Sequence, residues 1–196
     1  MTVQNLDATC LKHILKMTRH PEKLPNNVCQ LTSVFMLLYH APQLSILTIQ
    51  KADTEGYPWR NQMAFPGGHV DRDDASALDA GFRELREELN ITQDQITYIG
   101  TLGHFQTINN KDIQAFLGIW DGTGKICHDS GEISRIIIIP LKTLVDIHIQ
   151  QGYHGWLPDV FTLRYSYQDV TIWGVTAKIL HHFIETCYLH LEDIIA

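Results

Sequence analysis

Hydrophobic residues recur with a helical period in three parts of the chain. These parts are residues 6–17, about 74–89 and 174–190, and in each of them apolar side chains three and four apart form one stripe. The pattern indicates helices that bury one face against a core. A shorter helix is expected near residues 141–147, directly after Pro140.

The remaining apolar runs have the length and composition of strands. They cover residues 30–39, 44–50, 62–65, 96–105, 113–120, 136–139, 160–167 and 170–173. The run 136–139 contains only isoleucine and is followed by Pro140, so a buried strand is expected there. Polar turns at residues 40–43 and 168–169 predict two hairpins, and residues 109–110 predict a connecting loop. Strands on both sides of a central helix, with helices outside them, predict an α/β fold with a mixed sheet between helical layers.

The stretch from residue 65 to residue 91 carries the strongest chemical signal. A Phe-Pro-Gly-Gly turn leads through an acidic segment into the central helix. At ~3.6 residues per turn, Glu84, Glu87 and Glu88 fall within an arc of roughly 100°, apart from the apolar stripe. Like charges at this spacing repel each other, and Arg83 offsets only part of the repulsion. A divalent cation, which prefers carboxylate oxygens, would offset more. The alternative interpretation is a solvated acidic face with one arginine pair.

This stretch resembles the signature of the Nudix hydrolase family, G-x5-E-x7-R-E-U-x-E-E-x-G-U, in which U is aliphatic. The matching residues are Gly68, Arg83, Glu84, Leu85, Glu87, Glu88 and Ile91. Three features depart from it: the first acid is Asp74, one extra residue precedes Arg83, and Asn90 replaces the last glycine. Asparagine also suits the left-handed backbone that ends a helix. The first two departures are similar to the coenzyme A diphosphatase-like subgroup, in which Asp71 and Ser76 also match.

Three further segments are similar to the same subgroup. They are residues 47–48 with 60–68, residues 131–141, and residues 172–177, which read Ile-Trp-Gly-Val-Thr-Ala. Gln50-Lys51 stands where the subgroup has an arginine and Asn61 where it has a glycine, both within its coenzyme A signature. The resemblance implies a Nudix-type α/β/α sandwich with a central mixed sheet over residues 26–196. Residues 1–25 are then an N-terminal helical extension.

The resemblance also implies an activity and a set of site residues. We expect hydrolysis of the diphosphate bond in a nucleoside diphosphate derivative, with coenzyme A or a similar molecule as substrate and Mg²⁺ or Mn²⁺ as cofactor. The implied metal ligands are Glu84, Glu87, Glu88 and the carbonyl of Gly67. Arg83 is expected to orient the glutamates through a salt bridge. The residues expected to contact the substrate are Arg60, Gly67 and Gly68.

The sequence leaves the general base open. Glu132 is a candidate because it lies in a glycine-flanked loop before a strand, although a solvated loop acid has the same pattern. Glu84 or Glu87 is the alternative base. Asp74 is expected either to cap the central helix, a role that Asp73 also fits, or to hold water near the metal.

Histidines and tryptophans add weaker signals. Of 11 histidines, six show no spacing typical of a metal site: His13, His20, His40, His148, His154 and His190. His69 and His104 are the two most relevant to the expected site, although a structural or surface role is expected for each. Trp59 is a candidate for stacking on a base, and Trp173 is expected in the core.

Composition narrows the class of partner. The net charge of -7 and the absence of a Lys/Arg cluster argue against a nucleic-acid surface. Four widely spaced cysteines indicate reduced thiols and a cytoplasmic setting. Neither a signal peptide nor a membrane span of ~20 apolar residues is expected.

A small nucleotide is the expected partner. Two alternative functions stay open: an ADP-ribose or nucleotide-sugar diphosphatase, and a non-catalytic nucleotide-binding module.

Overall fold

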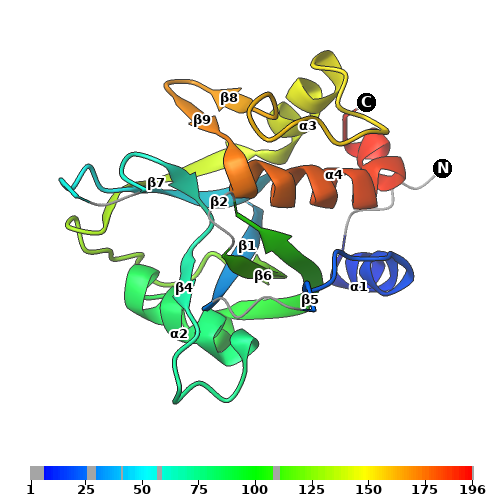
Figure 1. Cartoon of the computed structure of the whole chain (residues 1–196). Helices are drawn as coiled ribbons and strands as arrows, with labels where there is room; N and C mark the ends of the chain where they lie inside the picture. The colour runs from blue at the N-terminus through cyan, green and yellow to red at the C-terminus, as the bar shows by residue number, and fades with distance from the viewer. Residues whose placement is uncertain (1–6, 26–29, 41, 57–58, 108–110, 196) are drawn as a thin grey trace.

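The computed structural model describes residues 7–25, 30–40, 42–56, 59–107 and 111–195. A central mixed sheet lies between helical layers, as the sequence predicts (Figure 1). β1 and β6 are parallel, and the other paired strands of this sheet are antiparallel. The strands of the sheet are β1 Leu31–His40, β2 Leu44–Lys51, β3 Met63–Ala64, β4 Gly67–His69, β5 Ile96–Gln106, β6 Asp112–Trp120 and β7 Ile133–Pro140.

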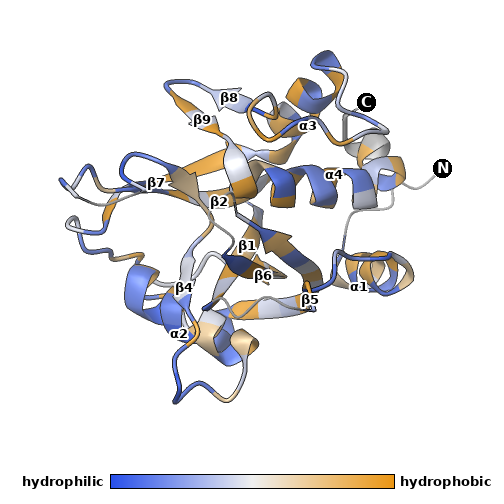
Figure 2. Ribbon diagram, viewed as in Figure 1, coloured by the Kyte–Doolittle hydropathy of each residue, from blue (hydrophilic) through white to orange (hydrophobic). Residues whose placement is uncertain are grey.

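β1 is buried on both faces, which explains its nearly continuous apolar sequence. Met36 packs into the core cluster that includes residues of α1 (Ala8–Met17) and α4 (Gly174–Ile195). Phe35, the residue before it, packs on the opposite face into the cluster beneath α2 (Ala77–Leu89). Figure 2 shows that α2 is largely hydrophilic where it faces away from the strands. The sheet therefore has α2, with its acidic face, on one side, and on the other side α1 and α4, which bury apolar side chains against the sheet.

The N-terminal helix packs on the main core. Asp7 caps α1, since its Oδ1 accepts a hydrogen bond of 2.8 Å from the backbone N–H of Cys10. Leu11, Ile14 and Leu15 are buried in the cluster that α4 also enters. The division of the chain at residue 26 stays a prediction.

The glycine turn lies where β1 and β2 separate. The two strands pair at residues 37–40 and 44–47, after which β3 pairs with β2 and β4 pairs with β1. The chain crosses between them at Pro66, whose carbonyl accepts a hydrogen bond of 2.9 Å from the N–H of Phe35. At Gly67 the backbone has φ 145°, and a Cβ there would lie 2.7 Å from the Cα of Val34. Only glycine allows β4 to approach β1 this closely.

β7 is less buried than its sequence predicts. Ile139 is fully buried, but Ile138 is 38% exposed and Ile136 and Ile137 are only partly buried, so the prediction of a buried strand at residues 136–139 is wrong for most of the run. Within the described part of the chain, β7 pairs with β2 alone. It is therefore an edge strand, and the helical layers cover it only in part.

The C-terminal part of the chain forms a smaller layer. α3 spans Leu141–Gln150 and packs against α4, and β8 (Tyr165–Tyr167) pairs with β9 (Val170–Ile172) in the expected hairpin. The expected connecting loop at residues 109–110 and Ala41 of the first hairpin turn lie outside the described residues. The cysteines that the structure describes, Cys10, Cys127 and Cys187, are unpaired by disulfides. Among the described helices, none has both the length and the apolar character needed to cross a bilayer.

Candidate active site

The ends of α2 are set by two polar residues. Ser76 is the N-cap, and its Oγ accepts a hydrogen bond of 3.2 Å from the N–H of Asp79. The expectation that Asp73 or Asp74 caps the helix is therefore wrong, since the helix begins at Ala77. At the other end Asn90 has φ 57° and ψ 30°, so the left-handed conformation expected at this position is confirmed.

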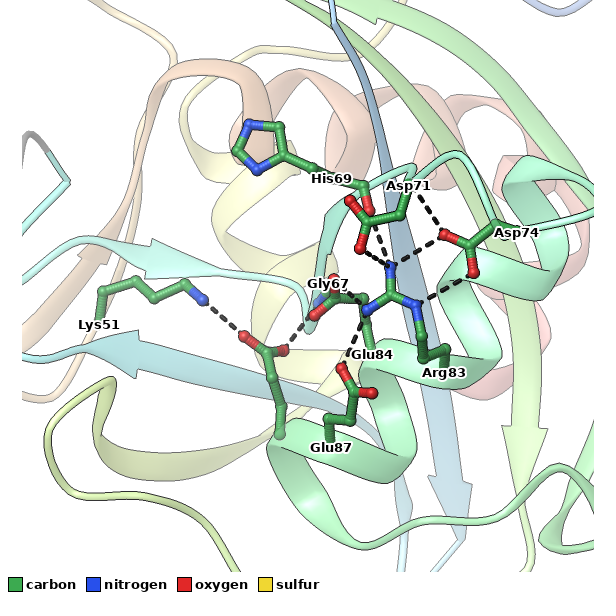
Figure 3. Close-up of polar contacts among 9 residues, drawn as sticks. Lys51, Gly67, His69, Asp71, Asp74, Arg83, Glu84 and Glu87 are labelled. Atoms are coloured by element: carbon green, nitrogen blue, oxygen red, sulfur yellow. Dashed lines mark hydrogen bonds and ion pairs between the residues drawn. The ribbon is translucent and has the colours of Figure 1, made fainter.

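Arg83 donates hydrogen bonds to three carboxylates, those of Asp74, Glu84 and Glu87 (Figure 3). Its Nε and Nη2 each donate a hydrogen bond of 3.0 Å to the carboxylate of Asp74, and Nη2 also donates to the carbonyl of His69 at 2.9 Å. Its Nη1 donates to Glu84 Oε1 at 3.0 Å and to Glu87 Oε2 at 2.9 Å. The two hydrogen bonds that Arg83 donates to Asp74 lower the pKa of that carboxyl group. The guanidinium thus joins the glycine turn to the exposed side of α2.

Glu88 is the most deeply placed of the three glutamates. The residue is only 7% exposed, and its Oε1 lies 2.7 Å from the Nζ of Lys51 at the end of β2. Its Oε2 accepts a hydrogen bond of 2.8 Å from the N–H of Gly67. The sequence showed Lys51 only as a departure from the subgroup, and gave no signal that it pairs with an acid 37 residues away.

Glu84 lies against the second glycine of the turn. A Cβ on Gly68 would lie 2.5 Å from the Cδ of Glu84, so the missing side chain leaves the space that this carboxylate occupies. Burial raises the pKa of Glu84; Arg83 opposes this shift, and the charges of Glu88 and Glu87 add to it. The site therefore concentrates negative charge in a partly desolvated position.

The turn and the glutamates border a cavity of about 590 Å³. Of the predicted site residues, those that line it are Gly67, Gly68, Glu84, Glu88 and Glu132. Glu87 and Arg83 do not line the cavity, and the half-exposed carboxylate of Glu87 points toward the guanidinium of Arg83. Arg60 also lies outside the lining, with its Nε 3.8 Å from Asp53, so its contact with substrate stays a prediction without geometric support.

Two of the tryptophans and histidines that the sequence singled out lie at the cavity. Trp59 and His69 line it, and the Nζ of Lys111 lies 4.3 Å from the ring centre of Trp59. His104 lies outside the lining, and its Nδ1 is 2.9 Å from Asp112. The expectation that Trp173 is buried is wrong, because it is 36% exposed.

The opposite wall of the cavity was indicated only indirectly by the sequence. The start of α4 contributes Val175, Thr176 and Ile179, and the first two belong to the Ile-Trp-Gly-Val-Thr-Ala match. β1 and β6 add Val34 and Ile113 to this wall. The cavity therefore has an acidic side formed by α2 and a largely apolar side formed by α4 and the sheet.

The acidic side has the donor chemistry of a hard divalent cation. The side chains of Glu84 and Glu88 offer oxygen atoms, which Mg²⁺ and Mn²⁺ prefer over nitrogen or sulfur. A bound cation would also favour the ionised form of Glu84, whose pKa burial raises. The residues present therefore fit such an ion, and Glu88 would exchange its contact with Lys51 for a contact with the metal.

Comparisons with known proteins agree with this arrangement. Residues 30–160 match the family model of the NUDIX domain. The uncharacterized Nudix hydrolase NudL of Photorhabdus laumondii is 23% identical over 175 residues, which cover 87% of this chain and 91% of that protein. NudL of Cronobacter sakazakii is 27% identical over 157 residues, covering 76% and 78% respectively.

Two solved structures share the fold. A MutT/nudix family protein from Enterococcus faecalis aligns with a TM-score of 0.52 at 16% identity, over 97% of this chain and 76% of that chain. A C. elegans Ap4A hydrolase binary complex aligns with a TM-score of 0.50 at 20% identity, over 62% and 90%. The matched family model covers more than half of the chain and includes the glycine turn, α2 and the loop of Glu132. The chain belongs to the Nudix hydrolase family.

Proposed function

We propose that this protein is a Mg²⁺- or Mn²⁺-dependent diphosphatase that acts on coenzyme A or a closely similar nucleoside diphosphate derivative. The observation that carries the proposal is the two-sided cavity, with Glu84 and Glu88 on one side and apolar residues of α4 and the sheet on the other. Its volume of about 590 Å³ lies within the range of small-molecule sites, roughly 300–1,000 Å³.

The acidic side would hold the diphosphate through metal ions. Glu84 and Glu88 are the proposed ligands, with Glu87 and the carbonyl of Gly67 as further candidates. A metal held here supplies charge neutralisation and an activated water when it is bound. Arg83 would keep the glutamates in position through its contacts with Glu84 and Glu87.

Glu132 is the proposed general base. It lines the same cavity as Glu84, although it comes from the loop before β7 and not from α2. A base must reach the attacking water directly or through one further water. Changing Glu132 to Gln should lower kcat and leave the binding of Mn²⁺ unchanged. If Glu84 were the base instead, changing Glu84 to Gln would lower both kcat and the affinity for Mn²⁺.

The opposite side of the cavity supports the substrate assignment. Coenzyme A carries a long pantetheine arm, and Val175, Ile179 and Ile113 offer apolar surface beside the proposed diphosphate position. Lys111, which also lines the cavity, is a candidate partner for a phosphate group outside the diphosphate. ADP-ribose and nucleotide sugars are the alternative substrates, since they share the diphosphate but lack the arm.

A substrate panel tests the proposal. The protein is incubated with Mn²⁺ and, separately, with coenzyme A, 3′-dephospho-coenzyme A, ADP-ribose, NADH and a dinucleoside polyphosphate, and the products are resolved by mass. We expect 3′,5′-ADP and 4′-phosphopantetheine from coenzyme A, and no products from the Glu88→Gln variant. Equal slow hydrolysis of every compound would remove the support for coenzyme A. The absence of any product would favour a nucleotide-binding module without catalysis.

A further inference from the structure

Three metal-binding side chains meet on the side of the molecule formed by α3 and α4. His148 lies on α3, Glu185 lies on α4, and His154 lies in the loop that follows α3. One ligand atom from each of them lies within 4.8 Å of the other two. These residues do not line the cavity of the candidate active site, so the cluster is separate from the Nudix motif.

The two imidazoles converge on one carboxylate oxygen. The Nε2 of His148 is 2.8 Å from Glu185 Oε1, and the Nδ1 of His154 is 2.9 Å from the same oxygen. Tetrahedral Zn²⁺ with bonds of ~2.0–2.1 Å holds its ligand atoms roughly 3.3 Å apart. The two nitrogen–oxygen distances would therefore need to lengthen by only about 0.5 Å to admit the ion, and all three ligand atoms already lie within 4.8 Å of one another.

Outer contacts hold each ligand in place. His148 is fully buried, and its other ring nitrogen, Nδ1, lies 2.9 Å from the hydroxyl of Tyr165. The second oxygen of Glu185 accepts a hydrogen bond of 2.9 Å from the N–H of Gly155. Ligands in metal sites are commonly oriented by such second contacts, which fix the histidine tautomer and the carboxylate rotamer.

The loop that carries His154 is fixed to α4 at a further point. The Nε2 of His181 is 2.9 Å from the carbonyl oxygen of Trp156 and 3.2 Å from that of Tyr153. The ring of His154 stacks on Tyr188 with a centroid distance of 3.6 Å and an interplanar angle of 13°. Its side chain is nevertheless 50% exposed, so a metal ion can enter from solvent and keep a water as its fourth ligand.

We propose that His148, His154 and Glu185 form a Zn²⁺ site that ties the loop after α3 to α4. Two imidazole nitrogens and one carboxylate oxygen are a donor set that suits Zn²⁺ and does not suit Mg²⁺. The active-site glutamates offer only oxygen and favour the harder ion. The two sites should therefore take different metals from the same solution.

Zinc titration in the presence of excess Mg²⁺ tests the proposal. The metal-free full-length chain is first saturated with Mg²⁺ to fill the oxygen site, and Zn²⁺ binding is then followed by calorimetry. We expect one high-affinity Zn²⁺ per chain in the wild type and its loss in His154→Ala and in Glu185→Gln. Tyr165→Phe, which removes only the hydroxyl beside His148, should weaken binding by about 10–100-fold.

Two controls place the zinc. His40→Ala, which removes an exposed histidine at the end of β1, should bind as the wild type does. Glu88→Gln should keep the same zinc, because Glu88 belongs to the other site. Zn²⁺ should raise the melting temperature of the wild type but not of His154→Ala, whose exposed position leaves the core intact. Undetectable Zn²⁺ binding in the wild type, or binding by His154→Ala equal to that of the wild type, would overturn the proposal and leave a hydrogen-bonded cluster only.

Discussion

Gly68 offers a direct test of how the active site is built. In Gly68→Ala the new Cβ would lie 2.5 Å from Glu84 Cδ and 2.7 Å from Glu84 Oε2. Ordinary van der Waals contact begins near 3.4 Å, so the carboxylate must move by about 1 Å. A displacement of that size in a catalytic group costs on the order of 100-fold in rate.

The fold should tolerate the same substitution. The clash is with the mobile end of a side chain, and Gly68 does not require the left-handed backbone that Gly67 has. We therefore expect the free energy of unfolding to change by less than about 1 kcal/mol. Activity is measured as kcat/KM for coenzyme A with Mn²⁺, and stability by thermal melting. The matched control is Gly100→Ala, where a Cβ would meet only the side chain of Leu15 at 3.2 Å.

The outcome separates two explanations of the turn. A large loss of kcat/KM at wild-type stability supports a site in which Glu84 holds the metal. If Gly68→Ala retained full activity with an ordinary Mn²⁺ requirement, the position of the Glu84 carboxylate would not matter for the reaction. The assignment of Glu84 as a ligand would then be wrong.

Three further predictions follow from the contacts. Lys51→Met should lower the unfolding free energy of the metal-free protein by about 3 kcal/mol, because the buried carboxylate of Glu88 loses its partner. The same variant should show a larger rise in melting temperature on addition of Mn²⁺ than the wild type, and an unchanged rise would mean that Lys51 and the metal do not compete for Glu88. Asn90→Ala should cost about 1 kcal/mol in chemical denaturation, because alanine is strained at φ 57°, and Asn90→Gly should cost less. Burial, with His20 and His181, lowers the pKa of His182 to about 4 from 6.5. The unfolded chain then binds more protons between these values, so stability falls as pH decreases from 6.5 toward 4, by up to about 3 kcal/mol. In His182→Gln this part of the pH dependence should disappear, and an unchanged curve would contradict the burial of a neutral imidazole.

Local patterns in the sequence were enough for the main elements. The two arcs of α2 follow from the helical period alone, and Asn90 ends the helix because its side chain tolerates the left-handed backbone. β1 was predictable from its apolar run, since both of its faces are covered. The predicted N-cap of α2 was wrong because two nearby residues, Ser76 and Asp74, both suit the start of a helix. In the folded chain the carboxylate of Asp74 accepts hydrogen bonds from Arg83 and so does not cap the helix.

Pairings between distant segments needed the tertiary structure. Lys51 meets Glu88 because β2 ends beside α2, and α4 forms a wall of the cavity because it packs across the same sheet. His148 and His154 have no spacing typical of a metal site, yet Glu185 joins them because α3 and α4 pack together. The edge position of β7 likewise depends on which strands find partners. Sequence periodicity reports which face of an element is buried, whereas the identity of the residue across the interface depends on how the whole chain packs.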